Sequence, residues 1–144
     1  MSEHPKQTIV RWFEEVWNKG WRQAIDEMLP PDCVIHDGST SLKGPEEFKK
    51  YFDLMRSAFS EIKVTPEEAI SEGAMVCLRW SVKMRHTGDG LGMPATGRNL
   101  QTTGISIVRF ANGRFAEAWQ NWDMLGVMQQ IQEAKPAKLY MQAP

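Results

Sequence analysis

The residues best suited to chemistry lie close together in the segment Ala118–Asp123. An amide, Gln120, and a carboxylate, Asp123, alternate there with tryptophans. Polar groups flanked by tryptophan near the end of a buried strand suit an apolar pocket that orients a polar ligand through a few hydrogen bonds. The same string fits an edge strand followed by a helix N-cap, because Asp is a favoured N-cap residue. Both interpretations stay open at this point.

A second candidate is His86, which ends a strongly alternating segment. Every second residue there is apolar, and His86 falls in phase with them; the set is Ala74, Val76, Leu78, Trp80, Val82, Met84 and His86. This period of two predicts a strand whose apolar face points inward. An imidazole at its end titrates near neutral pH and suits a general acid or base. A histidine hydrogen-bonded to a loop carbonyl is the structural alternative.

The elements that must position these side chains change from helical to strand-like along the chain. Apolar residues at helical spacing predict helices over 5–19, 21–29 and 44–59, with Pro30 and Pro31 ending the second. The strands are expected over 33–36, 62–70, 74–86, 99–110 and 115–123, followed by a last helix over 124–131. The pattern predicts an α+β fold in which three N-terminal helices cover one face of a strongly curved antiparallel sheet and a C-terminal helix follows.

Length and composition indicate one domain, residues 1–134, with a tail over 135–144. The formal net charge of −1 argues against a nucleic-acid partner, which would need an excess of Lys and Arg on one face. No apolar run approaches the roughly 20 residues of a membrane helix, and Met1–Gln7 is unlike a signal peptide. A cytoplasmic protein without membrane contact is therefore expected.

Neither a metal nor a nucleotide cofactor is indicated. Cys33 and Cys77 have no CxxC spacing, and the three histidines would need carboxylates that no motif supplies. The glycine-rich segment 87–98 has neither the Lys-Ser/Thr ending nor the following helix of a phosphate-binding loop. The expected partner is a small apolar ligand, bound in a pocket between the helices and the sheet. The outer sheet face is left for packing in a homodimer.

Several strings spread over most of the chain occur together in one known family. They are Glu15–Gly20, Asp32–Asp37, Gly44–Phe48, His86–Gly88, Leu91–Arg98, Thr103–Ser106, Trp119–Asp123, Leu125-Gly126 and Gln129-Gln130. In these strings and in the order of its elements the chain resembles the SnoaL-like polyketide cyclase (ester cyclase) family of the nuclear transport factor 2-like superfamily. The resemblance implies a cone-shaped α+β barrel, a dimer, and a cofactor-free enzyme with a hydrophobic cavity. Well-known members close the last ring of an aromatic polyketide by intramolecular aldol condensation, which requires a base and hydrogen-bond donors for the enolate.

The resemblance also places the family's acid/base pair, an Asp on the final strand and a nearby His on the preceding one. Counted between the hairpin glycine and the helix glycine, these places fall on Gln120 and Ser106. An amide does not titrate in the useful range and a lone serine hydroxyl is a poor proton acceptor, so both are expected to orient a carbonyl group or a water. A shifted alignment that used Asp123 instead would break the shared Trp122-Asp123 register.

Further site residues are implied by the resemblance. His36 and Asp37 lie in a family string rich in Asp and His, so one of them is expected to reach the cavity, with a turn at Asp37-Gly38 as the structural alternative. Trp17 matches an aromatic cavity position, and it is expected to contact the substrate together with Trp122 and Met93.

The leading hypothesis is a cofactor-free enzyme that acts by acid/base chemistry on a small apolar, carbonyl-containing compound of polyketide type. His86 is the first choice for proton transfer, with His36 and Asp123 behind it, and Gln120 and Ser106 as orienting groups. Cyclase, hydroxylase, hydrolase and isomerase reactions all stay open, because fold alone does not select among them. The alternative is a non-catalytic protein that binds a small molecule in the same cavity. A third, weaker reading is an interaction domain that uses the outer sheet face.

Overall fold

A helix that changes its pitch half-way opens the chain. The computed structural model describes residues 3–133. In it, α1 (Pro5–Trp12) runs directly into η1 (Phe13–Asn18), a π-helix. The sequence pattern predicted one regular helix over 5–19, and this prediction was wrong in its second half. The wider turn is closed by the Lys19 amide, which donates to the Glu14 carbonyl oxygen at 2.9 Å.

Asn18 supplies a physical reason for the wider turn. Its side-chain amide donates to the Val64 carbonyl oxygen at 3.0 Å and accepts from the Val64 N–H at 2.6 Å, so it pairs with the backbone of a strand distant in sequence. The same amide donates to the Glu14 carboxylate at 2.8 Å. A π-turn shifts the helical register by one residue, which lets Asn18 meet the strand while Phe13 and Trp17 face the interior.

The remaining elements follow the predicted order with one addition. They are α2 (Gln23–Met28), β1 (Val34–Asp37), β2 (Thr40–Lys43), α3 (Gly44–Ala58), β3 (Phe59–Glu72), β4 (Met75–His86), β5 (Asn99–Ala111), β6 (Arg114–Trp122) and α4 (Met124–Gln132). The short strand β2 was not predicted; it forms a hairpin with β1 around Gly38, whose φ of 62° favours glycine. Trp21, expected on the buried face of the second helix, lies before α2 and is 43% exposed.

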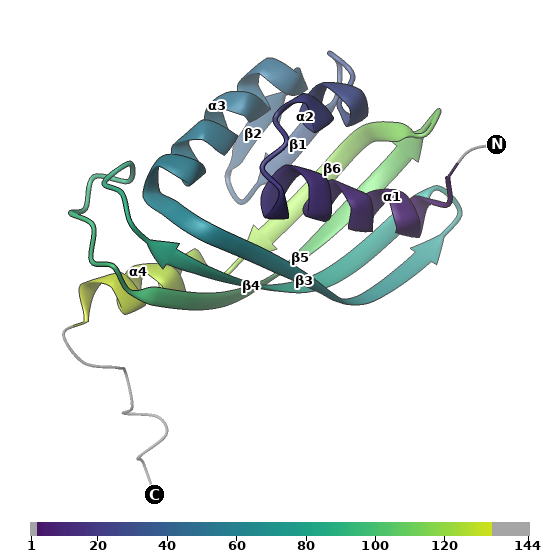
Figure 1. Cartoon of the computed structure of the whole chain (residues 1–144). Helices are drawn as coiled ribbons and strands as arrows, with labels where there is room; N and C mark the ends of the chain where they lie inside the picture. The colour runs from purple at the N-terminus through teal and green to yellow at the C-terminus, as the bar shows by residue number, and fades with distance from the viewer. Residues whose placement is uncertain (1–2, 134–144) are drawn as a thin grey trace, which may run out of the picture.

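The six strands form one mixed sheet in the order β2-β1-β6-β5-β4-β3 (Figure 1). All neighbours are antiparallel except β1 and β6, which pair in parallel, so the prediction of a purely antiparallel sheet was wrong at this one pair. The predicted hairpin between β5 and β6 is confirmed, with Asn112 and Gly113 at φ of 54° and 75°.

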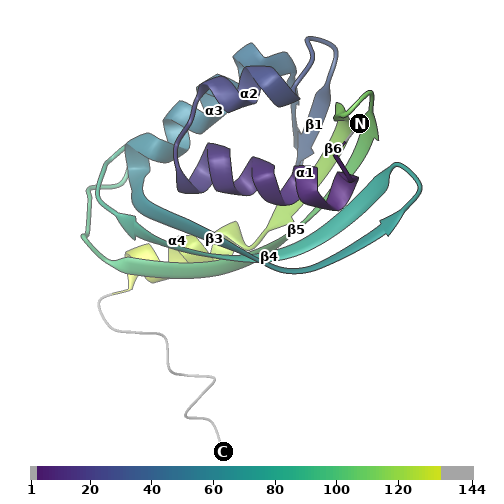
Figure 2. The same cartoon turned by 45° about the vertical axis from the view of Figure 1, so that its right-hand side comes forward.

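The sheet curves beneath the helices. All of them except α4 lie on its concave side (Figures 1 and 2). The alternation predicted for β4 is confirmed, because Val76, Leu78, Trp80, Val82, Met84 and His86 are all buried. These side chains join those of the helices in the hydrophobic core. The fold class is therefore the predicted α+β arrangement.

The C-terminal helix packs against the sheet at its far end, near β5. Within residues 3–133, no helix is both long and apolar enough to cross a membrane. The predicted tail, residues 135–144, lies outside the described residues.

The Asn18 pairing gives the first testable prediction. We expect Asn18→Ala to lower the free energy of unfolding by about 2 kcal/mol, because it leaves the N–H and C=O of buried Val64 without partners. Urea denaturation would measure this loss. The exposed neighbour Lys63 provides a control, since Lys63→Gln should change stability by less than about 0.5 kcal/mol. Equal stabilities for the two variants would contradict the anchoring role of Asn18.

Candidate functional site

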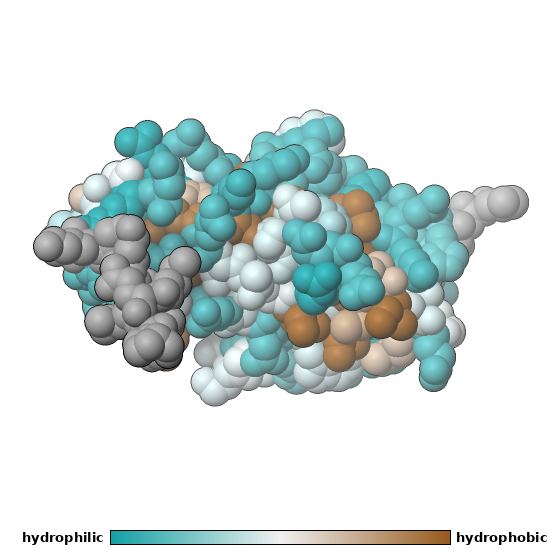
Figure 3. Space-filling model, turned by 90° about the horizontal axis from the view of Figure 1, so that it is seen from below, coloured by the Kyte–Doolittle hydropathy of each residue, from teal (hydrophilic) through white to brown (hydrophobic). Residues whose placement is uncertain are grey.

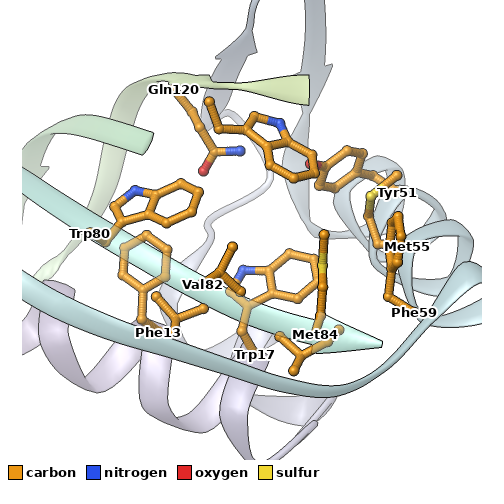
Figure 4. Close-up of a pocket in the computed structure, with 12 residues that line it drawn as sticks. Phe13, Trp17, Tyr51, Met55, Phe59, Trp80, Val82, Met84 and Gln120 are labelled. Carbon is orange, nitrogen blue, oxygen red and sulfur yellow. The ribbon is translucent and has the colours of Figure 1, made fainter. Parts of the chain in front are cut away.

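A cavity lies between the helices and the concave sheet face (Figure 4). About 440 Å³ of its space is not filled by protein atoms, the open mouth included. Its lining is almost entirely apolar and consists of Phe13, Trp17, Tyr51, Met55, Phe59, Ile62, Val64, Trp80, Val82, Met84, Gln120 and Trp122. A cavity of this kind suits a small apolar ligand that is oriented by few polar groups.

The aromatic side chains of the lining support one another. Trp17 packs against Phe52 and Tyr51 of α3, with ring centroids 5.4 and 6.1 Å apart. Trp80 and Trp122 also pack together, with ring centroids 6.5 Å apart. The structure thus places Trp17 and Trp122 in the cavity wall and holds them there by ring packing, while their contact with a substrate stays a prediction.

Gln120 and Ser106 lie side by side, as expected. They are directly paired residues of β6 and β5. The Ser106 hydroxyl donates to Gln120 Oε1 at 3.4 Å and accepts from the Trp80 indole N–H at 3.0 Å. Gln120 faces the cavity, whereas Ser106 is buried behind it and is not part of the lining. Ser106 therefore acts on a ligand only through Gln120.

Asp37 brings a carboxylate to the mouth of the cavity. It ends β1 opposite Gln120 in the parallel pair with β6. Asp37 lines an outer recess that shares Tyr51, Met55 and Trp122 with the main cavity. Burial raises the pKa of the Asp37 carboxyl above its usual value, although side-chain hydrogen bonding from Tyr51 and Gln120 opposes the rise.

Tyr51 of α3 is the second polar group of this cluster. Burial, and after it the nearby charge of Asp37, raises the pKa of the Tyr51 hydroxyl. The hydroxyl therefore stays protonated and can donate a hydrogen bond at any physiological pH. The sequence pattern indicated Tyr51 only as one of the spaced residues that predict the helix over 44–59. The available signal was a hydroxyl placed among phenylalanines and methionine on one helical face.

His36 lies on the opposite face of the sheet from Asp37, because neighbouring residues of a strand alternate. Its Nε2 is 2.7 Å from the Glu117 carboxylate and its Nδ1 is 3.1 Å from the Ser41 hydroxyl. The ring stacks on Trp119 with centroids 5.6 Å apart. One of His36 and Asp37 was expected to reach the cavity. Asp37 reaches its mouth and His36 does not. His36 therefore lies outside this cavity, and a catalytic role for it stays a prediction.

His86 is fully buried but does not belong to the cavity lining. Its Nδ1 lies 3.0 Å from the Thr96 hydroxyl and 3.3 Å from the Thr96 backbone nitrogen, and its Nε2 has no partner among the described residues. The imidazole thus ties segment 87–98 to the end of β4, close to the structural alternative foreseen for it. The strand is long enough that its last inward residue passes beyond the cavity. A role for His86 in proton transfer stays a prediction.

Asp123 and Met93 are also placed outside the cavity. Asp123 is exposed and caps α4, with its Oδ1 accepting the Gly126 N–H at 2.9 Å. The N-cap interpretation therefore holds, and the catalytic one is not supported by its position. Met93, expected at the substrate, packs against the core from segment 87–98 but is not in the lining. Among residues 3–133, no group of three or more His, Cys, Asp or Glu side chains could hold a metal ion.

Comparison with known proteins gives the family. The sequence profile of SnoaL-like polyketide cyclases matches residues 7–131 of the chain. The chain belongs to the SnoaL-like polyketide cyclase family. This SnoaL-like protein is 31% identical over 139 residues to the aklanonic acid methyl ester cyclase DauD of Streptomyces sp. (strain C5), covering 92% of this chain and 84% of the relative.

A second relative and two solved structures are also similar to this chain. The aklanonic acid methyl ester cyclase DnrD of Streptomyces peucetius is 31% identical over 135 residues, covering 89% of this SnoaL-like chain and 91% of the relative. A structure described as a polyketide cyclase from Acidithiobacillus ferrooxidans is 26% identical with a TM-score of 0.82, covering 94% and 99% of the two chains. One described as a SnoaL-like polyketide cyclase from Jannaschia sp. CCS1 is 24% identical with a TM-score of 0.82, covering 92% and 93%, and supports the fold.

The cap assigned to Asp123 can be tested directly. We expect Asp123→Ala to lower the free energy of unfolding by about 1 kcal/mol, because the first turn of α4 loses the acceptor for the Gly126 N–H. Asp123→Ser, which keeps a capping oxygen, should retain most of the stability. Urea denaturation of both variants provides the measurement. An equal loss in the two would show that the oxygen at this position does not act as a cap.

Proposed function

We propose that this protein is a cofactor-free enzyme that removes a proton next to a carbonyl group of a small apolar, polyketide-like compound, with Asp37 as the general base. The observation that carries this proposal is a carboxylate of raised pKa at the mouth of an aromatic cavity, beside two hydrogen-bond donors. A carboxylate whose pKa is raised is a stronger base, which suits it to take a proton from carbon.

Intramolecular aldol ring closure is the reaction we favour, because two relatives 31% identical to this chain are aklanonic acid methyl ester cyclases. Asp37 would take the proton from the carbon beside one carbonyl group. The enolate oxygen would accept hydrogen bonds from the Tyr51 hydroxyl and the Gln120 amide. The enolate carbon would then attack a second carbonyl of the same molecule, and the new alkoxide would take the proton back from Asp37. Substrate and product are isomers, so the step needs no further reactant.

This assignment moves the base from the position expected from the sequence. The family pattern places an acid/base Asp where this chain has Gln120, and sequence reasoning turned to His86 to replace it. In the parallel β1–β6 pair, however, Asp37 is the direct partner of Gln120. The neighbouring strand can therefore supply a carboxylate within reach of the same ligand atoms, whereas His86 is tied to Thr96 outside the cavity lining.

The proposal is tested with aklanonic acid methyl ester, the substrate class in the names of the relatives. We expect Asp37→Asn to slow ring closure by about 10²–10⁴-fold, because the variant keeps the shape of the side chain and loses the base. Chromatographic separation of the two isomers measures the rate. Binding of the compound, followed by quenching of tryptophan fluorescence, should stay within a few-fold of the wild type.

His86→Gln is the matched control. With Asp37 as the base, the rate should fall at low pH with a midpoint above the ordinary Asp value of about 4, because burial raises the pKa of this carboxyl. An active Asp37→Asn variant and an inactive His86→Gln variant would overturn the proposal. Tight binding without turnover in the wild type would instead favour the non-catalytic binding protein.

We further propose that the protein forms a homodimer through the outer, convex sheet face. Figure 3 looks onto this face, where apolar residues gather within a hydrophilic border. A row of paired residues crosses the sheet from β6 to β3, namely Trp119, Ile107, Cys77 and Ile70. Ile70 and Ile107 are 64% and 36% exposed, and neighbouring Ile105 is 48% exposed. Apolar side chains collected in this way favour burial against a second copy.

A charge in this row should separate the subunits. We expect Ile107→Lys to yield monomers at micromolar concentration, because an unpaired ammonium group would be buried at the centre of the interface. Size-exclusion chromatography with light scattering gives the mass. Leu54→Lys, an equally drastic change at an exposed apolar site on α3, should leave the dimer intact. A wild-type monomer, or a dimer that persists in Ile107→Lys, would contradict this interface.

A further inference from the structure

The orientation of the Gln120 amide is decided by a tryptophan two strands away. The indole N–H of Trp80 can only donate, and it donates to the Ser106 hydroxyl oxygen at 3.0 Å inside the core. The Ser106 oxygen is therefore an acceptor for the indole, and its own hydrogen is available for another acceptor. That acceptor is Gln120 Oε1, 3.4 Å away.

The consequence concerns which end of the amide faces the ligand. With Oε1 held by Ser106, the NH₂ end of Gln120 points away from β5, toward the side where Asp37 and Tyr51 lie. The influence of Gln120 on Asp37 agrees, because its side-chain hydrogen bond lowers the pKa of the Asp37 carboxyl, as a bond donated to the carboxylate does. The cavity is thus offered N–H donors by Gln120 and a hydroxyl by Tyr51, the titratable group that Asp37 faces from α3.

The sheet is built to admit the indole that begins this chain of hydrogen bonds. Gly104 of β5 is the direct partner of Trp80 on β4. A Cβ atom at position 104 would overlap the six-membered ring of that indole. The glycine therefore leaves the space across which Trp80 reaches Ser106, two residues along the same strand. Without this space the indole N–H could not lie where it does.

We propose that Trp80 is a positioning residue, whose N–H sets a one-way series of hydrogen bonds through Ser106 to Gln120 and makes the cavity selective for ligands that present a hydrogen-bond acceptor. The selected ligand class is a flat apolar ketone or its enolate, and the rejected class is a compound of the same shape that presents an N–H or O–H donor. This inference rests on the proposed function for its meaning in catalysis, but the recognition itself does not require turnover.

Two rigid tricyclic probes of nearly the same shape test the selectivity. Fluorenone presents only a carbonyl acceptor, and carbazole presents only an N–H donor. We expect the wild type to bind fluorenone more tightly than carbazole. Trp80→Phe and Ser106→Ala should each reduce the ratio of the fluorenone affinity to the carbazole affinity by about fivefold or more, because the Gln120 side-chain amide becomes free to flip. Phe13→Leu alters the cavity wall that packs on the Trp80 ring but removes no hydrogen-bonding group of the series, so it should weaken both probes alike and leave the ratio unchanged.

A second readout needs no ligand. Titration of the Asp37 carboxyl by carbon NMR should give a higher midpoint in Trp80→Phe and Ser106→Ala than in the wild type or Phe13→Leu, because the carboxylate loses a steady N–H donor. An unchanged Asp37 midpoint together with an unchanged probe ratio in both variants would overturn the inference. If neither probe binds, the Asp37 midpoint alone decides it. An inactive wild-type protein in the ring-closure assay would remove the proposed reaction but not this result.

Discussion

Polar groups set in an apolar cavity must find hydrogen-bond partners there, and this requirement organises the site. An indole N–H, a hydroxyl, an amide and a carboxylate lie along one line across four strands, from Trp80 through Ser106 and Gln120 to Asp37. The indole donates to the hydroxyl and the hydroxyl donates to the amide oxygen, so the direction of donation is fixed at one end by the indole. A side chain that reversed this order would leave a buried group unpaired at a cost of about 1–3 kcal/mol.

The curved sheet and the π-helix make this arrangement possible. The parallel pairing of β1 with β6 brings Asp37 beside Gln120, although the two are far apart in sequence. On the other wall, η1 turns Phe13 and Trp17 toward the cavity while Asn18 holds the helix to β3. The regular α-helix that the spacing favours would satisfy its own backbone equally well. The long-range pairing with Val64 adds two hydrogen bonds to the irregular form, which is how tertiary contacts override local pattern.

The sequence predicted the structure correctly where the residues next to one another in the chain determine the strand, its buried face or its turn. The alternation of β4 and the Asn112-Gly113 turn predicted strand, face and hairpin correctly. The family resemblance placed Gln120 near Ser106, and the register of the β5–β6 hairpin pairs the two residues directly. The strand pattern gave the buried face of His86 but not its place outside the cavity lining, since phase along a strand gives the face and not the distance from the cavity. It could not choose between His36 and Asp37, because the face of so short a strand depends on its pairing with β6.

The amide at position 120 has a further consequence for charge. A carboxylate there, opposite Asp37, would place two negative groups side by side, and their repulsion would push the pKa of one of them upward. Gln120 offers Asp37 a donor in place of a like charge, so burial becomes the leading cause of its raised pKa and the hydrogen bonds limit the rise. The site then holds one carboxylate that is a base when ionised, and the amide beside it can only stabilise negative charge. This division is what the proposed reaction would require, since proton removal and an enolate need both a base and hydrogen-bond donors in place before the ligand arrives.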